Sequence, residues 1–241
     1  MQKEKSVGPT CVIEFLGIET DSIERQLKIT EKRMAELREE LNEWKGKGVC
    51  TKRELLSLHG KLKFCSNVVH DGKKFTRRIV ALSKKGKSLH SRLRLGKEAK
   101  KDITWWVKCM GCHNGIAWFN KDFEIDKAVL IFTDASDEAM AGVVIHKWTM
   151  MVFNGEHVWM RKKSIAWKEL AAIVMTLSTF GSLLAEKNVI MGIDNEGIQL
   201  ALENGVSKND DIMALVRAVY FYTSMNNIKY KTVHVKSQWN I

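Results

Sequence analysis

The spacing of apolar residues changes near residue 127, and this change constrains the fold more than any other feature of the sequence. Before it, apolar residues recur at steps of three and four, which is the period of an amphipathic helix. After it, continuous apolar runs of strand length alternate with helical segments. We therefore predict an α/β chain with a helical region over residues 1–120 and a mixed region over residues 121–241.

The first region contains the signals of four helices. Thr51 and Glu54 have the spacing of a capping box, which typically begins a helix. Trp105 and Trp106 lie on the last of the four, where adjacent positions point about 100° apart, so at least one faces the core. We expect the first helix to be capped by Thr30 and stopped by Gly46 and Gly48, and the others to cover residues 51–70, 73–84 and 97–107.

The second region predicts strands and helices in a defined order. Three strands are followed by a helix, a strand, two helices and a final strand. Asn154-Gly155 is a typical turn signal and is expected to close a hairpin. We expect strands over residues 128–132, 141–148, 151–159, 189–193 and 228–235, and helices over residues 167–184, 195–204 and 212–222.

The net charge of +11 is concentrated in the first region. Residues 1–120 contain 26 Lys and Arg against 14 Asp and Glu, whereas residues 121–241 contain 13 against 14. Residues 73–101 alone contain twelve basic residues and one acid. A basic stripe on structured elements is typical of phosphate binding, although a solvated face has the same composition. The candidate nucleic-acid-binding residues are Lys73, Lys74, Arg77, Arg78, Lys84 and Lys85.

Three acids stand at the edges of apolar elements in the second region. Asp134 follows a buried strand, Glu169 lies in the first turn of the long helix, and Asp194 ends another strand. Taken singly, they could be a turn residue, a surface acid and a capping acid. Three carboxylates over one sheet repel unless cations hold them, and Mg²⁺ or Mn²⁺ suits oxygen ligands. Two such ions about 4 Å apart can activate water for attack on a phosphodiester.

Other classes of protein lack support in the sequence. No stretch approaches the roughly 18 apolar residues of a membrane span, and residues 1–5 lead into no signal region. The five cysteines are scattered, which favours reduced thiols, and we expect an intracellular protein, cytoplasmic or nuclear, without a membrane partner. Residues 109–113 match the C-x-x-C-H string of c-type haem attachment, but the absent export signal argues against haem.

The acidic segments resemble a known family. Thr133–Ser136, Trp167–Leu170 and Asp194-Asn195 resemble the first three acidic motifs of ribonuclease H domains, in particular those attached to reverse transcriptases of DIRS-type retrotransposons. This resemblance implies a ribonuclease H-like mixed five-stranded sheet with helices. It also implies an endonuclease that hydrolyses the RNA strand of an RNA/DNA hybrid, using two Mg²⁺ or Mn²⁺ ions held by four carboxylates.

The resemblance assigns roles to three acids and leaves the fourth missing. Asp134 would bridge both ions, Glu169 would hold one and orient the substrate, and Asp194 would hold the other. The family's fourth motif has the form H-V-P-G-x-x-N-x-x-A-D; residues 234–241 follow that spacing but end before the Asp. We therefore expect a domain truncated at its C-terminus. It is either a nuclease or a catalytically inactive nucleic-acid-binding fragment, a domesticated remnant of a reverse transcriptase polyprotein.

The first region resembles the segment that follows a reverse transcriptase palm. Glu14–Ile18 resembles the primer grip, Glu54–Leu62 the thumb helix, and Asp102–Trp106 with His113–Gly115 the connection. The resemblance implies a thumb and connection whose basic helices follow the backbone of a hybrid or duplex through salt-sensitive contacts. It also implies a partner, the polymerase palm and fingers upstream in the same polyprotein, and a chain that does not polymerise by itself.

Overall fold

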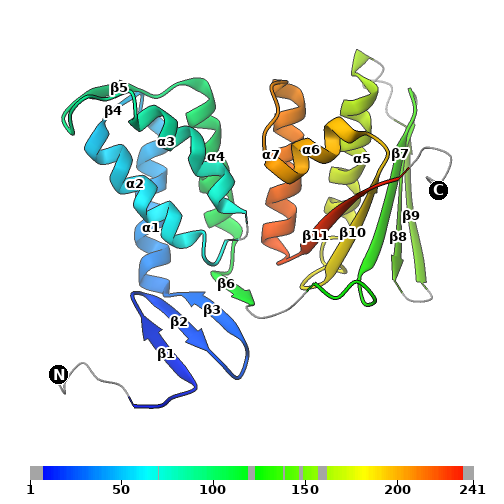
Figure 1. Cartoon of the computed structure of the whole chain (residues 1–241), viewed down its shortest axis with the longest axis horizontal. Helices are drawn as coiled ribbons and strands as arrows, with labels where there is room; N and C mark the ends of the chain where they lie inside the picture. The colour runs from blue at the N-terminus through cyan, green and yellow to red at the C-terminus, as the bar shows by residue number, and fades with distance from the viewer. Residues whose placement is uncertain are drawn as a thin grey trace. The chain divides into compact units, whose positions relative to one another are not determined.

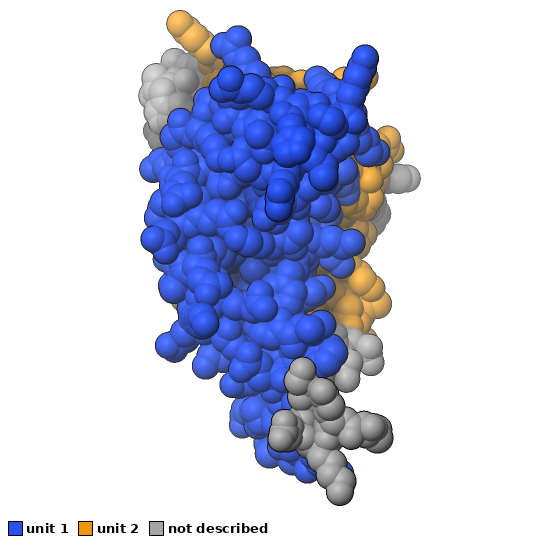
Figure 2. Space-filling view, turned by 90° about the vertical axis from the view of Figure 1, so that its left-hand side faces the viewer, with its two compact units in different colours: residues 1–121 blue, residues 122–241 orange. Residues whose placement is uncertain are grey.

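The computed structural model describes residues 8–69, 71–118, 123–137, 139–146, 149–156 and 162–235. The chain divides into two compact units, Met1–Lys121 and Asp122–Ile241, coloured blue and orange in Figure 2. None of the described helices has the length and apolar composition needed to cross a membrane.

Unit 1 combines helices with small antiparallel sheets (Figure 1). Its helices are α1 (Glu31–Gly46), α2 (Lys52–Cys65), the 3₁₀ helix η2 (Gly72–Thr76), α3 (Arg77–Ser83) and α4 (Lys97–Cys112). One sheet has the order β1-β2-β3-β6, with β1 (Val12–Phe15), β2 (Ile18–Asp21), β3 (Gln26–Ile29) and β6 (Ile116–Trp118). A second, two-stranded sheet pairs β4 (Val49–Thr51) with β5 (Arg92–Arg94).

Two local predictions for unit 1 are confirmed. The capping box is present, because the Thr51 hydroxyl accepts a hydrogen bond from the Glu54 N–H at 3.2 Å and the Glu54 carboxylate accepts one from the Thr51 N–H at 2.6 Å. Trp105 and Trp106 are both buried, and the centroid of the Trp105 ring lies 4.3 Å from the centroid of the Phe75 ring. Both tryptophans therefore belong to the core.

The strands of unit 1 are a structural finding that the sequence pattern does not predict. β1, β2 and β3 have four residues each, and all four side chains of β1 are exposed. β2 is half-buried throughout and β3 buries only Ile29, so these short strands show no hydrophobic alternation. The helix expected over residues 73–84 is also divided into η2 and α3, and Phe75 within η2 has a non-helical φ of −92° and ψ of 20°.

Unit 2 is built on one five-stranded sheet. Its strands are β7 (Val129–Ala135), β8 (Ala139–His146), β9 (Thr149–Glu156), β10 (Asn188–Ile193) and β11 (Lys229–His234). Its helices are α5 (Ile165–Phe180), α6 (Glu196–Asn204) and α7 (Asp210–Met225). The strand order is β11-β10-β7-β8-β9, in which β10 is parallel to β7 and β11, whereas β7, β8 and β9 are antiparallel. This confirms the predicted α/β class, with a mixed five-stranded sheet and helices.

The prediction of a turn at Asn154-Gly155 is wrong. Both residues lie within β9, where Asn154 pairs with Ala141 and Gly155 with Met140. An Asn-Gly pair makes a hairpin turn only when the strands on either side of it pair with each other. Here the pairing of β9 with β8 places both residues inside a strand.

Helix α5 approaches the sheet closely beside the end of β7. Ala171 and Ala172 of α5 form a buried cluster with Ala135, the last residue of β7, and Met140, the second residue of β8. Small side chains allow the helix and the sheet to come close together. This packing fixes the start of α5 next to the segment that carries Asp134.

Candidate functional site

The sheet topology brings Asp134 and Asp194 to the same edge. β7 and β10 are neighbouring parallel strands, with Gly192 paired to Phe132. Asp194 and Asp134 each follow two residues later, so continuing the register places them opposite each other. Parallel strands end at the same edge of a sheet, which is where ligands bind in open α/β folds.

Glu169 reaches the same edge from α5. The helix begins at Ile165 because the Ser164 hydroxyl accepts a hydrogen bond from the Trp167 N–H, so Glu169 lies in the second turn and not in the first turn, where the sequence pattern predicts it. The Asn195 side-chain amide donates to Glu169 Oε2 at 3.1 Å. This hydrogen bond holds Glu169 beside the segment that follows β10.

The three acids influence one another electrostatically. Burial raises the pKa of the half-buried Glu169, and the negative charge of Asp194 raises it further. The hydrogen bond from Asn195 lowers this pKa, and the charge of Asp134 again raises it. The site therefore holds negative charge that is not fully compensated, and a cation would stabilise it.

The arrangement of the carboxylates is open. Asp134 is exposed, and its Oδ1 accepts a hydrogen bond from the Ala135 N–H at 2.8 Å. Across the part of the chain that the structure describes, no group of three or more His, Cys, Asp or Glu side chains is arranged so that it could hold a metal ion. Mg²⁺ typically keeps several waters and uses one or two carboxylates together with substrate phosphates. The all-oxygen donor set and the open arrangement fit such an ion.

The fourth acidic motif falls largely outside the described residues. His234 ends β11, is exposed and pairs with Ile193 of β10. Residues 236–241, which carry the rest of the predicted motif, lie outside the described part.

The six predicted nucleic-acid-binding residues do not share one environment. Lys73, Arg77, Lys84 and Lys85 are exposed. Lys74 is half-buried and forms an ion pair with Asp71 at 3.1 Å. Four of the six therefore present their charge at the surface of unit 1.

Arg78 acts within the fold. Its guanidinium contacts both carboxylate oxygens of Asp102, at 3.2 and 3.1 Å, and Glu98 at 3.5 Å. Asp102 is fully buried, so its charge depends on this partner. Arg78 thereby joins α3 to α4. Asp102 follows Lys101 in the sequence, and nothing in its local pattern indicates burial.

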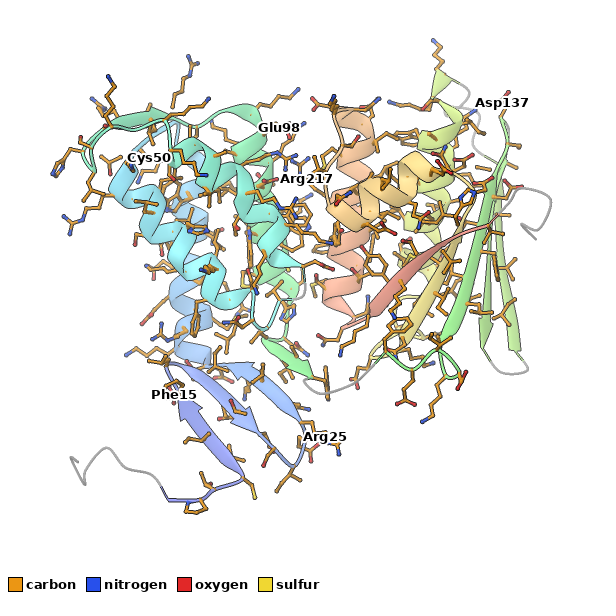
Figure 3. All side chains as sticks on the ribbon, viewed as in Figure 1. Phe15, Arg25, Cys50, Glu98, Asp137 and Arg217 are labelled. Carbon is orange, nitrogen blue, oxygen red and sulfur yellow. The ribbon has the colours of Figure 1, made fainter. Side chains whose placement is uncertain are left out.

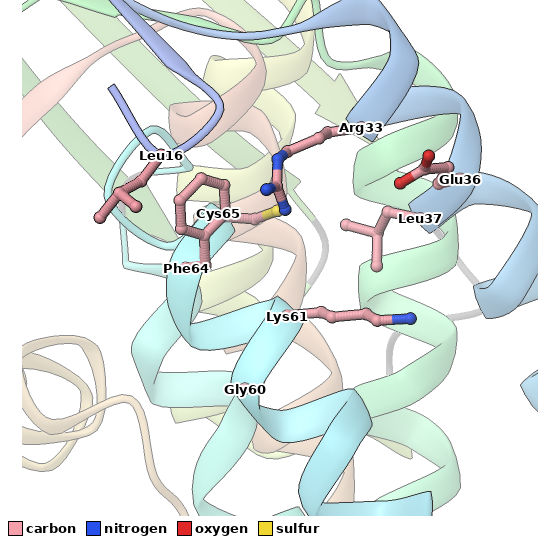
Figure 4. A pocket seen from close by; sticks show the side chains of 8 residues that line it. All are labelled: Leu16, Arg33, Glu36, Leu37, Gly60, Lys61, Phe64 and Cys65. Atoms are coloured by element: carbon pink, nitrogen blue, oxygen red, sulfur yellow. The ribbon is translucent and has the colours of Figure 1, made fainter. Parts of the chain in front are cut away.

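The structure also reveals a cavity of about 380 Å³ between the β1–β2 turn, α1 and α2 (Figure 4). Its lining is Leu16, Arg33, Glu36, Leu37, Gly60, Lys61, Phe64 and Cys65. The Arg33 guanidinium lies 5.2 Å from the centre of the Phe64 ring. Gly17 has φ +84°, a backbone conformation in which any other residue would be strained, so the turn favours glycine. The apolar period of the sequence gives no signal for Arg33, and its contact with Phe64 becomes visible only in the packed structure.

The C-x-x-C-H string has a structural role. Cys109 is fully buried near the end of α4, and burial raises the pKa of its thiol to about 12. His113 is also buried, and its Nδ1 accepts a hydrogen bond from the Gly115 N–H at 2.9 Å. These residues connect α4 to β6.

Comparisons with known proteins give matches only among solved structures. No family model matches the chain, and no curated protein matches it significantly. The chain is similar to RNase H1 from Halobacterium salinarum NRC-1, with 16% identity, 47% of this chain and 89% of that chain covered, and a TM-score of 0.37. It is also similar to LC11-RNase H1 in complex with RNA/DNA hybrid, with 14% identity, 46% of this chain and 88% of that chain covered, and a TM-score of 0.38.

Another similar structure spans both units. The foamy viral protease-reverse transcriptase in complex with RNA/DNA hybrid is 14% identical, with 99% of this chain and 31% of that chain covered and a TM-score of 0.35. The chain spans less than half the length of the foamy viral proteins that it matches. Identities and TM-scores this low do not establish a function for the chain.

Proposed function

We propose that unit 2 is a ribonuclease H-like nuclease that hydrolyses the RNA strand of an RNA/DNA hybrid, and that unit 1 helps to bind the duplex. The proposal is supported by the strand register that aligns Asp134 with Asp194, and by the Asn195–Glu169 hydrogen bond that links α5 to the segment after β10. The raised pKa of Glu169 reflects the mutual repulsion of the three carboxylates in addition to burial. Uncompensated carboxylates at an open edge attract hard divalent cations.

The proposed ligands are the three carboxylates. When bound, two Mg²⁺ or Mn²⁺ ions supply an activated water and stabilise the leaving oxygen of the phosphodiester. Asp134, Glu169 and Asp194 would hold these ions. Asn195 orients Glu169 through its 3.1 Å hydrogen bond. The exposure of Asp134 leaves the site accessible to a duplex.

Unit 1 is proposed to act as a thumb-and-connection-like region over residues 1–120. Its exposed basic residues, Lys73, Arg77, Lys84 and Lys85, are suited to contact phosphates without reading sequence. Two further proposals follow from the motifs: the chain derives from a DIRS-type retroelement polyprotein, and polymerase palm and fingers precede it.

The test is cleavage of an end-labelled RNA/DNA hybrid by the full chain, with Mg²⁺ and separately with Mn²⁺. Asp134→Asn removes a metal-binding charge without changing the size of the side chain. We expect it to lower the rate by more than about 100-fold, the upper range for loss of an outer-shell partner. Asp126→Asn is the matched control, because Asp126 is exposed and precedes β7, at the opposite end of that strand. Cutting that persists in Asp134→Asn would contradict the proposal.

Binding without cleavage is the alternative function, and the open arrangement of the described carboxylates favours it. A parallel titration of the same hybrid separates the two. Salt-sensitive binding of the hybrid, with no cleavage in the presence of either Mg²⁺ or Mn²⁺, would identify unit 2 as a fold that does not perform hydrolysis.

A further inference from the structure

Lys168 is a buried lysine beside one of the proposed metal ligands. Its side chain is 1% exposed. Its Nζ donates to Asp137 Oδ1 at 2.7 Å and lies 3.4 Å from the Asp137 carbonyl oxygen. A buried ammonium is costly unless it is paired, and Asp137, whose side chain is 87% exposed, supplies the oxygens that pair with it. Asp137 lies between β7 and β8 and is labelled in Figure 3.

The segment that Lys168 contacts follows directly after Asp134. The Ser136 N–H donates to the Ala139 carbonyl at 2.8 Å, and the Ser136 hydroxyl accepts from the Ala139 N–H at 3.0 Å. These hydrogen bonds make the segment a tight connection between β7 and β8. A shift of Asp137 would therefore move the end of β7, and Asp134 with it.

Lys168 and Glu169 link α5 to two different segments. Consecutive helical residues point about 100° apart, so the two side chains leave α5 in different directions. Lys168 contacts the segment after β7, whereas Glu169 accepts a hydrogen bond from Asn195 in the segment after β10. Helix α5 thus connects the two segments that carry Asp134 and Asp194.

We propose that Lys168 is a positioning residue for the carboxylate site, because its ion pair with Asp137 sets the separation of Asp134 from Glu169. The proposal rests on the proposed nuclease function for its effect on turnover. The geometry itself does not depend on that function. A lysine that only filled the core would be replaceable by Met, which has a similar length and no charge.

The experiment compares Lys168→Met with Lys168→Arg in the full chain. Lys163→Met is the matched control, because Lys163 Nζ also lies 2.7 Å from an aspartate, Asp211, but Lys163 is 37% exposed. The measurements are thermal unfolding, Mn²⁺ binding by calorimetry without nucleic acid, and kcat and KM for hybrid cleavage. We expect Lys168→Met to weaken Mn²⁺ binding and lower kcat by about 10- to 100-fold with KM unchanged. Lys168→Arg restores part of the loss, and Lys163→Met behaves as the wild type.

Asp137→Asn is the second variant, because it leaves the core intact and can replace Lys168→Met if that variant does not fold. A folded variant that binds Mn²⁺ as tightly as the wild type overturns the inference. If the wild type neither binds Mn²⁺ nor cuts hybrid, the proposed function fails, and amide hydrogen exchange at Ala135, Ser136 and Ala139 then tests the positioning alone. Faster exchange in the variant supports it, and unchanged exchange overturns it.

Discussion

The carboxylate site of unit 2 and the basic stretch of unit 1 relate to the sequence in opposite ways. Asp134, Glu169 and Asp194 are far apart along the chain, yet the sheet topology and α5 bring them to one edge. The basic residues of positions 73–85 are close in sequence, yet the structure divides them between exposed positions and half-buried positions engaged in ion pairs. Closeness in sequence is therefore a poor guide to which charges act together in this chain.

The difference has a physical cause. An acid at the carboxyl end of a strand has a position determined by strand pairing, so its neighbours follow from the topology. A lysine or arginine on a helix has a long side chain, whose contacts depend on the elements that pack nearby. The predictions below test this contrast in both units.

The largest effect on folding is expected from Arg78→Met. This change leaves the buried carboxylate of Asp102 without its guanidinium partner, and such losses destabilise proteins by about 3–5 kcal/mol. Because Arg78 is 22% exposed, we expect the lower end, about 3 kcal/mol, in urea unfolding. Arg92→Met, at an exposed position of β5, is the control and should remain within about 0.5 kcal/mol. Equal stabilities would show that Arg78 is an ordinary surface residue.

The double variant Lys84→Gln, Lys85→Gln should show the opposite behaviour. Both side chains are exposed, so the free energy of unfolding should stay nearly unchanged while affinity for hybrid falls several-fold. The slope of log affinity against log salt should decrease by about 2, because two phosphates are no longer neutralised by lysine. Lys127→Gln with Lys208→Gln removes the same charge from exposed positions of unit 2 and is the control. An equal loss of affinity in the control would mean that only net charge matters.

Asn195 has two roles that substitution can separate. Its Oδ1 accepts a hydrogen bond from the Ile198 N–H at the start of α6, and its amide donates to Glu169. Asn195→Ala should cost about 1 kcal/mol of stability from the lost cap, and Asn195→Ser should recover most of it. In both variants the pKa of Glu169 should rise above its wild-type value, because the Asn195 hydrogen bond lowers it. Titration of the carboxyl by NMR measures this, and recovery of the pKa by Ser would contradict the assigned hydrogen bond.

Much of unit 2 could be predicted from the sequence because its buried strands are apolar and continuous. The prediction of strand and helix order depends on that pattern, and the three acids stand out because each interrupts it. The prediction of a turn at Asn154-Gly155 is wrong because strand pairing decides where a hairpin closes, and the dipeptide alone does not. The ion pair of Lys168 with Asp137 was also missed, since the burial of a lysine depends on tertiary packing.

Unit 1 was less predictable for the same reason. Its helices have apolar faces with a clear period, whereas β1 has no buried residue and therefore no pattern. The basic stretch shows where positive charge is concentrated in the sequence. It does not show that Arg78 pairs with a buried acid whereas Lys84 is exposed, because that acid, Asp102, lies on another helix. Packing partners distant in sequence thus decide what local composition leaves open.

The smallest effect is a pH dependence with opposite signs in the two units. Burial and the neighbouring acids raise the pKa of Glu169, so the folded state binds this proton more tightly than the unfolded chain does. Its contribution to the free energy of unfolding is therefore largest in acid and falls as pH rises through the raised pKa. In the capping box, hydrogen bonds from Lys47 and Thr51 lower the pKa of Glu54 to about 2. Its contribution is present at neutral pH and is lost as pH falls from the unfolded value toward about 2.

Urea unfolding at a series of pH values, without divalent ions, tests the two slopes. Relative to the wild type, Glu169→Gln should gain stability as pH rises to neutral, whereas Glu54→Gln should lose it. Adding Mg²⁺ at neutral pH should stabilise the wild type more than Glu169→Gln, because a bound cation turns the repulsion among the carboxylates into attraction. If Glu169→Gln follows the wild type at every pH and in Mg²⁺, the three carboxylates do not act as one charged site. The carboxylates of unit 2 would then be no more coupled in charge than the basic residues of unit 1, and the contrast between the two regions would not hold.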